Sequence, residues 1–163
     1  MSTVTLDDIQ LFLARETKDS TTFQALCTTL LGEQLNYYKG GDVRRPMEQM
    51  PYFASYKLNQ EDRRGRPTIW HVQFVIAIDA TADFAGGPTL TDGIFQYNTD
   101  STIELLARGA ITAIETALCN FGIGGDLTLE VMNKNILITE VGEATDMQAI
   151  VTLQIENKIY LEG

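Results

Sequence analysis

The clearest hydrophobic pattern in the chain lies between Asp100 and Gly122. Apolar residues recur there at steps of three and four, the spacing that puts side chains on one face of an α-helix. Ser101 and Glu104 are spaced as a capping box, and Gly122 is typical of a left-handed helix stop. The predicted apolar stripe consists of Ile103, Ala107, Ala110, Ile114, Leu118 and Phe121. A helix of this length, about 30 Å, needs a broad apolar surface to pack against.

Two runs rich in aromatic and β-branched residues, 52–58 and 68–79, predict the strands of a long β-hairpin. A polar loop over residues 59–67 separates them. In the second strand His71 lies on a mixed face, which we expect solvent or another subunit to cover. The opposite face is entirely apolar and is the predicted core face: Trp70, Val72, Phe74, Ile76 and Ile78.

The C-terminal part of the chain predicts three more strands, over residues 127–132, 135–141 and 147–160. Asn133 and Lys134 predict a tight turn between the first two, although the glycine that is usual in such turns is missing. The last strand alternates between apolar and polar residues, so we expect it to be half buried. Its predicted inward face consists of Ala149, Val151, Leu153 and Ile155.

Two shorter helices are predicted ahead of the hairpin. Thr5 and Asp8 have the spacing of a cap, and the apolar residues that follow them recur at helical steps. Ser20 or Thr21 can cap a second helix over residues 21–35. Together these elements predict an α+β fold, with helices packed on one face of a mostly antiparallel sheet.

Two connections carry turn residues. Residues 36–51 contain paired glycines and two prolines, with a short extended piece at Tyr37 and Tyr38. Residues 80–99 contain a Gly-Gly-Pro and an Asp-Gly sequence, so we expect an exposed or poorly ordered connection with one short strand at residues 94–97.

The length of 163 residues and the 44% hydrophobic content predict one domain over residues 1–163. The longest nearly apolar run, residues 72–80, is far shorter than the ~20 residues needed to cross a membrane. The first residues lack the pattern of an export signal, which indicates synthesis in the cytoplasm. Cys27 and Cys119 both lie among apolar residues of predicted helices, so we expect two buried free thiols.

The net charge of −10 is unevenly distributed. Residues 1–70 hold nine bases and nine acids, whereas residues 71–163 hold three bases and thirteen acids. Such an acidic second part repels phosphate backbones and argues against ordinary binding to duplex DNA. The asymmetry also suits oriented contacts between copies of the chain, although surplus acids that keep a protein soluble explain it equally well.

Few residues have the pattern of a catalytic or metal site. His71 is the only histidine, so a histidine-based zinc site or a catalytic triad has no second histidine to use. Asp79, Asp83 and Asp92 can supply oxygen ligands for a divalent cation, but their spacing matches no known calcium or phosphate loop. Solvated loop acids are the simpler interpretation. We therefore expect no catalytic residue, no cofactor and no metal.

The remaining cluster is Arg63, Arg64 and Arg66, at the tip of the predicted hairpin. Guanidinium groups on an exposed tip can pair with phosphates or with carboxylates of a neighbouring molecule, and a solvated loop is the simpler alternative. Because the second part of the chain is acidic, carboxylates of another copy are the better match. On the polar face of the long helix, Glu104 and Glu115 are the corresponding candidates for a subunit seam or a lumen.

The order of these elements resembles that of the tail-terminator and tail-completion (neck) proteins of long-tailed bacteriophages. The resemblance covers most of the chain and is carried by residues 21–35, the hairpin strands, residues 101–118 and residues 147–161. It has no signature motif, and the first helix and the long connection over residues 80–99 depart from the plainest pattern. No site residue is therefore transferred from the family.

The resemblance implies a structural virion protein without enzymatic activity, made in the host cytoplasm. It implies a ring, commonly a hexamer, that ends growth of the tail tube and joins the tail to the head connector. The expected partners are other copies, the tail-tube protein and the head-connector protein, with DNA only passing through the lumen and no membrane. Acids lining such a lumen would let DNA slide.

Two other functions stay open at this point. A tail-tube or other neck protein would share the α+β composition but would polymerise into long tubes. A small acidic ligand- or metal-binding domain would use Asp79, Asp83 and His71, and it would be stabilised by its cation.

Overall fold

The computed structural model describes residues 4–40, 50–119, 129–141 and 146–157. The main helices are α1 (Leu6–Asp19), α2 (Thr21–Leu31) and α4 (Thr99–Leu118). The strands of the main sheet are β1 (Asn36–Lys39), β2 (Tyr52–Glu61), β3 (Ile69–Asp79), β6 (Leu129–Val141) and β7 (Asp146–Asn157). A smaller unit consists of α3 (Thr81–Gly86), β4 (Thr89–Thr91) and β5 (Ile94–Gln96).

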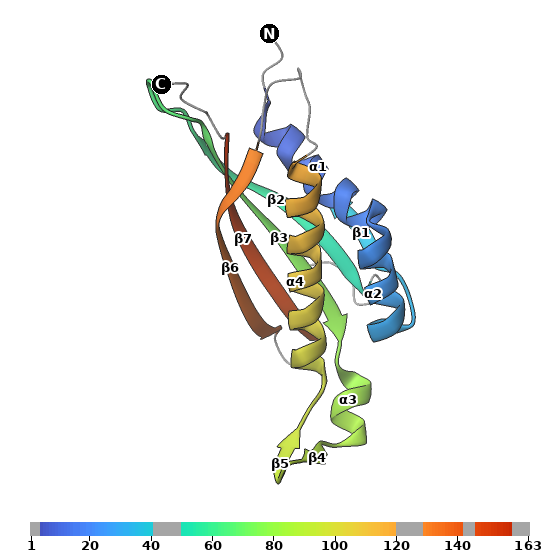
Figure 1. Ribbon diagram of the computed structural model, residues 1–163. Helices are drawn as coiled ribbons and strands as arrows, with labels where there is room; N and C mark the ends of the chain where they lie inside the picture. The colour runs from blue at the N-terminus through green and yellow to red at the C-terminus, as the bar shows by residue number, and fades with distance from the viewer. Residues whose placement is uncertain (1–3, 41–49, 120–128, 142–145, 158–163) are drawn as a thin grey trace.

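The main sheet and the helices form two layers (Figure 1). The strand order is β1-β2-β3-β7-β6; β1 runs parallel to β2, and the other neighbouring pairs are antiparallel. Helices α1 and α4 pack on one face of this sheet, and α2 packs against both of them. This confirms the predicted α+β class, with a mostly antiparallel sheet and helices on one face. Among the described helices, none has the length and apolar character needed to cross a membrane.

The core lies between α4 and the two central strands, β3 and β7. The predicted inward faces of both strands are buried, and their register pairs Val72 with Leu153 and Phe74 with Val151. Phe74 also stacks on Phe53 of β2, with ring centroids 4.9 Å apart. In α4 the predicted stripe is buried from Ile103 to Leu118. Phe121 and Gly122 lie outside the described residues.

The starts of the first two helices agree with their sequence signals. Thr5 and Asp8 form the predicted capping box: the Thr5 hydroxyl accepts from the Asp8 amide, and the Asp8 carboxylate accepts from the Thr5 amide. Ser20 caps α2. That helix ends before residue 35, because Gly32 adopts the left-handed conformation with φ 73° and stops it.

The predicted capping box of the long helix is wrong. Helix α4 already begins at Thr99, so Ser101 lies within its first turn. The capping carboxylate comes from α3 instead: Asp83 Oδ2 accepts from the amide and from the hydroxyl of Thr99, both at 2.8 Å. Glu104 pairs with Arg108 one turn further along the helix. A negative charge beside a helix N-terminus is favourable because it meets the positive end of the helix dipole.

The predicted turn at Asn133 and Lys134 is also wrong, because β6 is one continuous strand with a β-bulge between Val131 and Asn133. Val131 pairs with the inward-facing Ile155, and after the bulge it is Lys134 that pairs with the inward-facing Leu153. The extra residue therefore reverses which alternate positions face the helices. In the sequence this change of phase looks like the end of one strand and the start of another.

The hairpin and the short extended piece are confirmed as β2, β3 and β1. The face of β3 that was predicted to be mixed is more buried than its composition implies, because Val75 and Ala77 pack with Tyr52 and Ala54 in a second small cluster. The connection over residues 80–99 is exposed as expected and includes the strand β5, but it also contains α3 and β4, which were not predicted.

One of the two cysteine predictions is wrong. Cys27 is fully buried as expected, and burial raises the pKa of its thiol to about 11. Cys119 is exposed, because it lies at the C-terminal cap of α4, after the last buried residue of the helix, Leu118. Both are free thiols.

Two phenylalanines provide a matched test of this core. Phe74→Ala removes a fully buried ring and should lower the free energy of unfolding by about 3–5 kcal/mol. Phe95→Ala removes a ring that is 71% exposed, and the change should stay within about 0.5 kcal/mol. Denaturation in urea, followed by circular dichroism, measures both. Equal losses in the two variants would contradict this core.

The Asp83 cap makes a prediction about pH. The hydrogen bonds from the Thr99 side chain and amide lower the pKa of Asp83 below its ordinary 3.8. The carboxylate therefore stabilises the folded state above about pH 4, and this contribution is lost as pH falls through the lowered pKa. Asp83→Ala should lower the melting temperature at pH 7, and this difference should shrink as pH falls through the lowered pKa of Asp83.

Asp100→Ala is the matched control. Asp100 lies in the same helix turn, and within the described residues its carboxylate accepts only from the adjacent Ser101 amide. At pH 7, Asp83→Ala should lower the melting temperature more than Asp100→Ala does. If it lowers the melting temperature no more than the control, or leaves it unchanged, the cap is not important for stability.

Candidate interaction surfaces

The tip of the β2–β3 hairpin is a defined turn. Asp62 accepts hydrogen bonds from Gln60 at 3.0 Å and from the Thr68 hydroxyl at 3.0 Å, and so joins the two ends of the loop. Within the loop, the Arg66 amide donates to the Arg63 carbonyl at 3.1 Å, and Gly65 takes a positive φ of 71°. The hairpin extends to the end of the molecule opposite α3, β4 and β5 (Figure 1).

The three predicted arginines of this tip have different surroundings. Arg63 is tied to its own chain, because its guanidinium donates to the Pro67 carbonyl at 3.1 Å and to Glu156 of β7 at 3.3 Å. Arg64 and Arg66 are exposed, and their side chains form no ion pair with the described residues. The available positive charge of the tip is therefore that of Arg64 and Arg66.

The two predicted glutamates lie on α4, apart from the arginine tip. Glu104 accepts from Arg108 at 3.0 Å, and Glu115 accepts from Lys134 of β6 at 3.0 Å. All four side chains of these pairs are at least 41% exposed, and surface pairs of this kind contribute little to stability. The structure thus divides the predicted interface residues between two surfaces and gives both glutamates a partner in their own chain.

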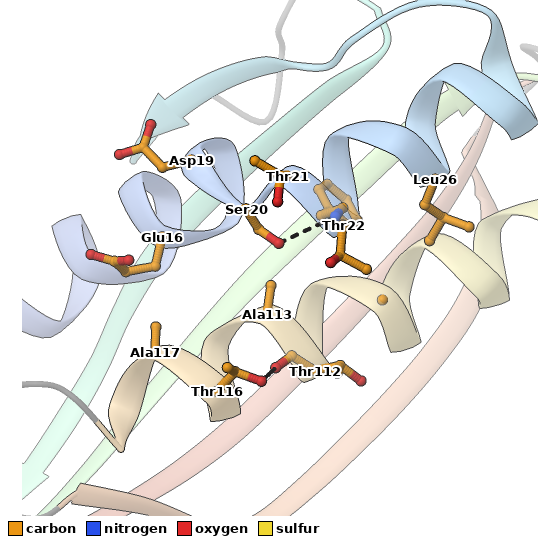
Figure 2. A pocket seen from close by; sticks show the side chains of 12 residues that line it. Glu16, Asp19, Ser20, Thr21, Thr22, Leu26, Thr112, Ala113, Thr116 and Ala117 are labelled. Atoms are coloured by element: carbon orange, nitrogen blue, oxygen red, sulfur yellow. Dashed lines mark hydrogen bonds between the residues drawn. The ribbon is translucent and has the colours of Figure 1, made fainter.

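Two grooves flank the outer side of α4, each with a volume of about 520 Å³. The α2–α4 groove lies where α1 meets α2, and its lining includes Glu16, Asp19, Thr22, Leu26, Ala113 and Ala117. In Figure 2 the two acids stand at the end of α1, and the two alanines face them from α4. The α4–β6 groove is lined by Arg108, Ile111, Thr112, Glu115, Lys134, Asn135 and Ile136.

The grooves differ in charge. Glu16 and Asp19 are the charged residues of the α2–α4 groove, whereas the α4–β6 groove holds two bases and one acid. Arg108 and Lys134 are also the two bases of the described residues from 71 onward. The sequence pattern did not single out either groove, because each depends on how elements distant in the chain pack against α4.

The residues considered for a cation or an acid–base site have local structural roles. His71 lies 3.0 Å from Glu61 across the hairpin, and Asp79 accepts from the Thr81 amide at 2.8 Å. Asp83 caps α4, and Asp92 lies in the β4–β5 turn. Among the described residues, no three His, Cys, Asp or Glu side chains gather as a metal site would require. The structure does not bring these candidates together.

One buried carboxyl was not predicted. Asp146 is the first residue of β7 and is 5% exposed, and its Oδ1 has no hydrogen-bond partner among the described residues. Its neighbour across the sheet is Asp79. Burial raises the pKa of Asp146 above its ordinary 3.8, and the charge of Asp79 raises it further. This carboxyl opposes folding when it is ionised.

The surface that the sequence reasoning missed is the projection formed by β4 and β5. Leu90, Ile94 and Phe95 are 59%, 61% and 71% exposed there. A signal for this hairpin was present in the sequence. Leu90 precedes the Asp92–Gly93 turn and Phe95 follows it, and apolar residues on both sides of Asp-Gly are typical of a short hairpin.

Comparisons with known proteins find similarity among solved structures. No family model matches the chain, and no curated protein matches it significantly. Among solved structures, the chain is similar to a chain from the virion of a native gene transfer agent (GTA) particle. The two are 16% identical, the alignment covers 91% of this chain and 93% of that one, and the TM-score is 0.49.

The buried carboxyl at position 146 predicts a stabilising substitution. Asp146→Asn removes the charge, so it should raise the melting temperature at pH 7. The gain should disappear as pH falls below about 3.8, because wild-type Asp146 is then protonated in both the folded and the unfolded state.

The matched control is Asp92→Asn, an aspartate in an exposed turn, which should leave the melting temperature nearly unchanged at both pH values. A lower melting temperature for Asp146→Asn at pH 7 would mean that the ionised carboxylate has a stabilising partner.

Proposed function

We propose that this chain is a structural protein of a tailed, phage-like virion. In this proposal several copies, six in the commonest arrangement, form a ring at the head-proximal end of the tail. The ring ends growth of the tail tube and joins the tail to the head connector. The partners are other copies of the chain, the tail-tube protein and the head-connector protein.

The observation that carries the proposal is the pair of exposed projections at opposite ends of the molecule (Figure 1). One is the hairpin tip with Arg64 and Arg66, and the other is the hairpin of β4 and β5 with its exposed apolar side chains. Projections of different chemistry at two ends suit a head-to-tail contact between identical subunits, the kind that produces rings or filaments. An enzyme would need a site of convergent polar groups instead.

The element order gives a second line of support. A long hairpin, a twenty-residue helix across the sheet and a strongly alternating last strand are all present in the structure. They are the features on which the resemblance to tail-terminator proteins depends. The acidic surplus of residues 71–163 also suits the wall of a lumen through which DNA passes without being held.

Asp79, Asp83 and His71 do not support the cation-binding alternative, because each of them forms a local hydrogen bond. A tail-tube protein remains the second candidate. Negative-stain electron microscopy of purified protein separates the two: a terminator gives single closed rings, and a tube protein gives stacks of many rings. A monomer at every concentration would overturn both.

The hairpin tip can be tested by Arg64→Ser with Arg66→Ser, keeping Arg63 because it holds Glu156. If both guanidinium groups pair with carboxylates of a neighbour, the double variant should lose about 0.4–2 kcal/mol of association free energy at each subunit contact. The reason is that exposed ion pairs contribute roughly 0.2–1 kcal/mol each. The concentration at half-assembly should then rise by roughly two- to thirtyfold, as measured by light scattering. Raised salt should weaken wild type more than the variant.

A matched control removes two bases from another exposed surface, Arg15→Ser with Lys18→Ser on α1. This control should assemble like the wild type. If the two double variants behave alike, the arginine tip has no specific role in the contact.

A further inference from the structure

The projection beyond the N-terminus of α4 is an arm with a fixed position. We call residues 81–97 the arm. At its start Asp79 accepts from the Thr81 amide, and just past its end Thr99 donates to Asp83 of α3. At its tip Asp92 and Gly93 take positive φ angles of 54° and 74°, as a tight two-residue hairpin turn requires. The arm is thus held at both ends and at its turn.

The arm presents apolar side chains to solvent on a very small sheet. Leu90 and Phe95 are cross-strand partners, so they lie on the same face of the β4–β5 pair. They are 59% and 71% exposed. An isolated two-stranded hairpin is marginally stable in water, and exposed aromatic side chains of this kind are typical of contact surfaces. The face formed by Leu90 and Phe95 therefore needs a partner surface.

The two grooves beside α4 offer different matches for this arm. Residues 80–99 contain acids and no base, and Asp92 stands at the tip. The α2–α4 groove would set Glu16 and Asp19 against that acid. The α4–β6 groove has apolar surface from the half-buried Ile136, with Arg108 and Lys134 among its lining residues. Charge complementarity therefore selects the α4–β6 groove.

We infer that the arm of one copy docks in the α4–β6 groove of a second copy, with Leu90 and Phe95 against Ile136. In this contact Asp92 faces the bases of the groove, Arg108 and Lys134. Both bases already pair with glutamates of their own chain, so the incoming acid joins an existing network of exposed charges. Apolar contact with Ile136 and the charges of the groove both contribute to the attraction, and the charges select the groove.

The contact is heterologous, because each copy contributes one arm and one groove. A two-fold dimer cannot be made from a single such contact, whereas a ring uses every arm and every groove once. The inference rests on the self-association required by the proposed function, but it does not depend on a role in a virion.

The first experiment measures assembly of Phe95→Ala by light scattering over a range of concentrations. We expect the concentration at half-assembly to rise at least about tenfold, because a central aromatic side chain of a contact carries much of its affinity. Leu11→Ala is the control, since Leu11 is 42% exposed on α1 and lies outside both grooves. It should assemble like the wild type, and the urea midpoint of each variant shows that it is folded.

The second experiment tests the choice of groove with a double-mutant cycle. Lys134→Glu places an acid opposite Asp92 and should weaken assembly. Asp92→Asn keeps a residue that tolerates the left-handed turn and removes the repulsion, so Lys134→Glu should weaken assembly less in that background. Additive effects would mean that the two positions do not meet.

Cross-linking gives a direct readout of the contact. In a Cys119→Ser background, Thr91→Cys with Asn135→Cys joins the arm to the α4–β6 groove, and a short bis-maleimide should give a ladder of covalent oligomers. The matched pair is Thr91→Cys with Thr22→Cys, which probes the α2–α4 groove and should give no ladder. A ladder from the matched pair alone would overturn the inference.

The outcomes separate the inference from the proposed function. A wild-type protein that stays monomeric overturns both, because no ring forms. A wild-type protein that assembles, with Phe95→Ala assembling equally well, overturns the arm contact and leaves the ring in place.

Discussion

The packing of α4 across β3 and β7 is the interaction on which the rest of the structure depends. Small side chains on its inner face, Ala107 and Ala110, are fully buried and let the helix approach the sheet closely. Once α4 lies there, its outer side faces solvent between two grooves, and its first turn is where the arm ends. The surfaces proposed for contacts between copies are therefore positioned by a helix whose own role is to close the core.

Much of the fold follows from periodicity, because burial in the structure repeats the pattern of the sequence. The inward faces of β3 and β7 and the stripe of α4 could be predicted for this reason. The errors lie where a distant residue or an irregular backbone decides. The start of α4 depends on Asp83, sixteen residues before Thr99, and the continuity of β6 depends on a bulge. No local pattern reports either of these features.

The candidate surfaces were predictable in part for a related reason. The exposure of Arg64 and Arg66 follows from their place in a polar hairpin loop. The binding of Arg63 to Glu156 does not, because the two residues are ninety-three positions apart and meet only when β7 joins the sheet. The grooves and the arm likewise require the packed helices. Sequence reasoning located charged groups well, whereas it could not tell which of them the fold had already paired.

The bulge in β6 has a consequence for how copies of the chain associate. β6 is the last strand of the described sheet, and a long outer strand is a template for backbone pairing with another chain. The bulge bends this strand, and Lys134 follows directly after the shift in register. Both features disfavour edge-to-edge growth into cross-β fibres. The proposed contacts between copies use side chains instead, and such contacts can end at a finite number of subunits.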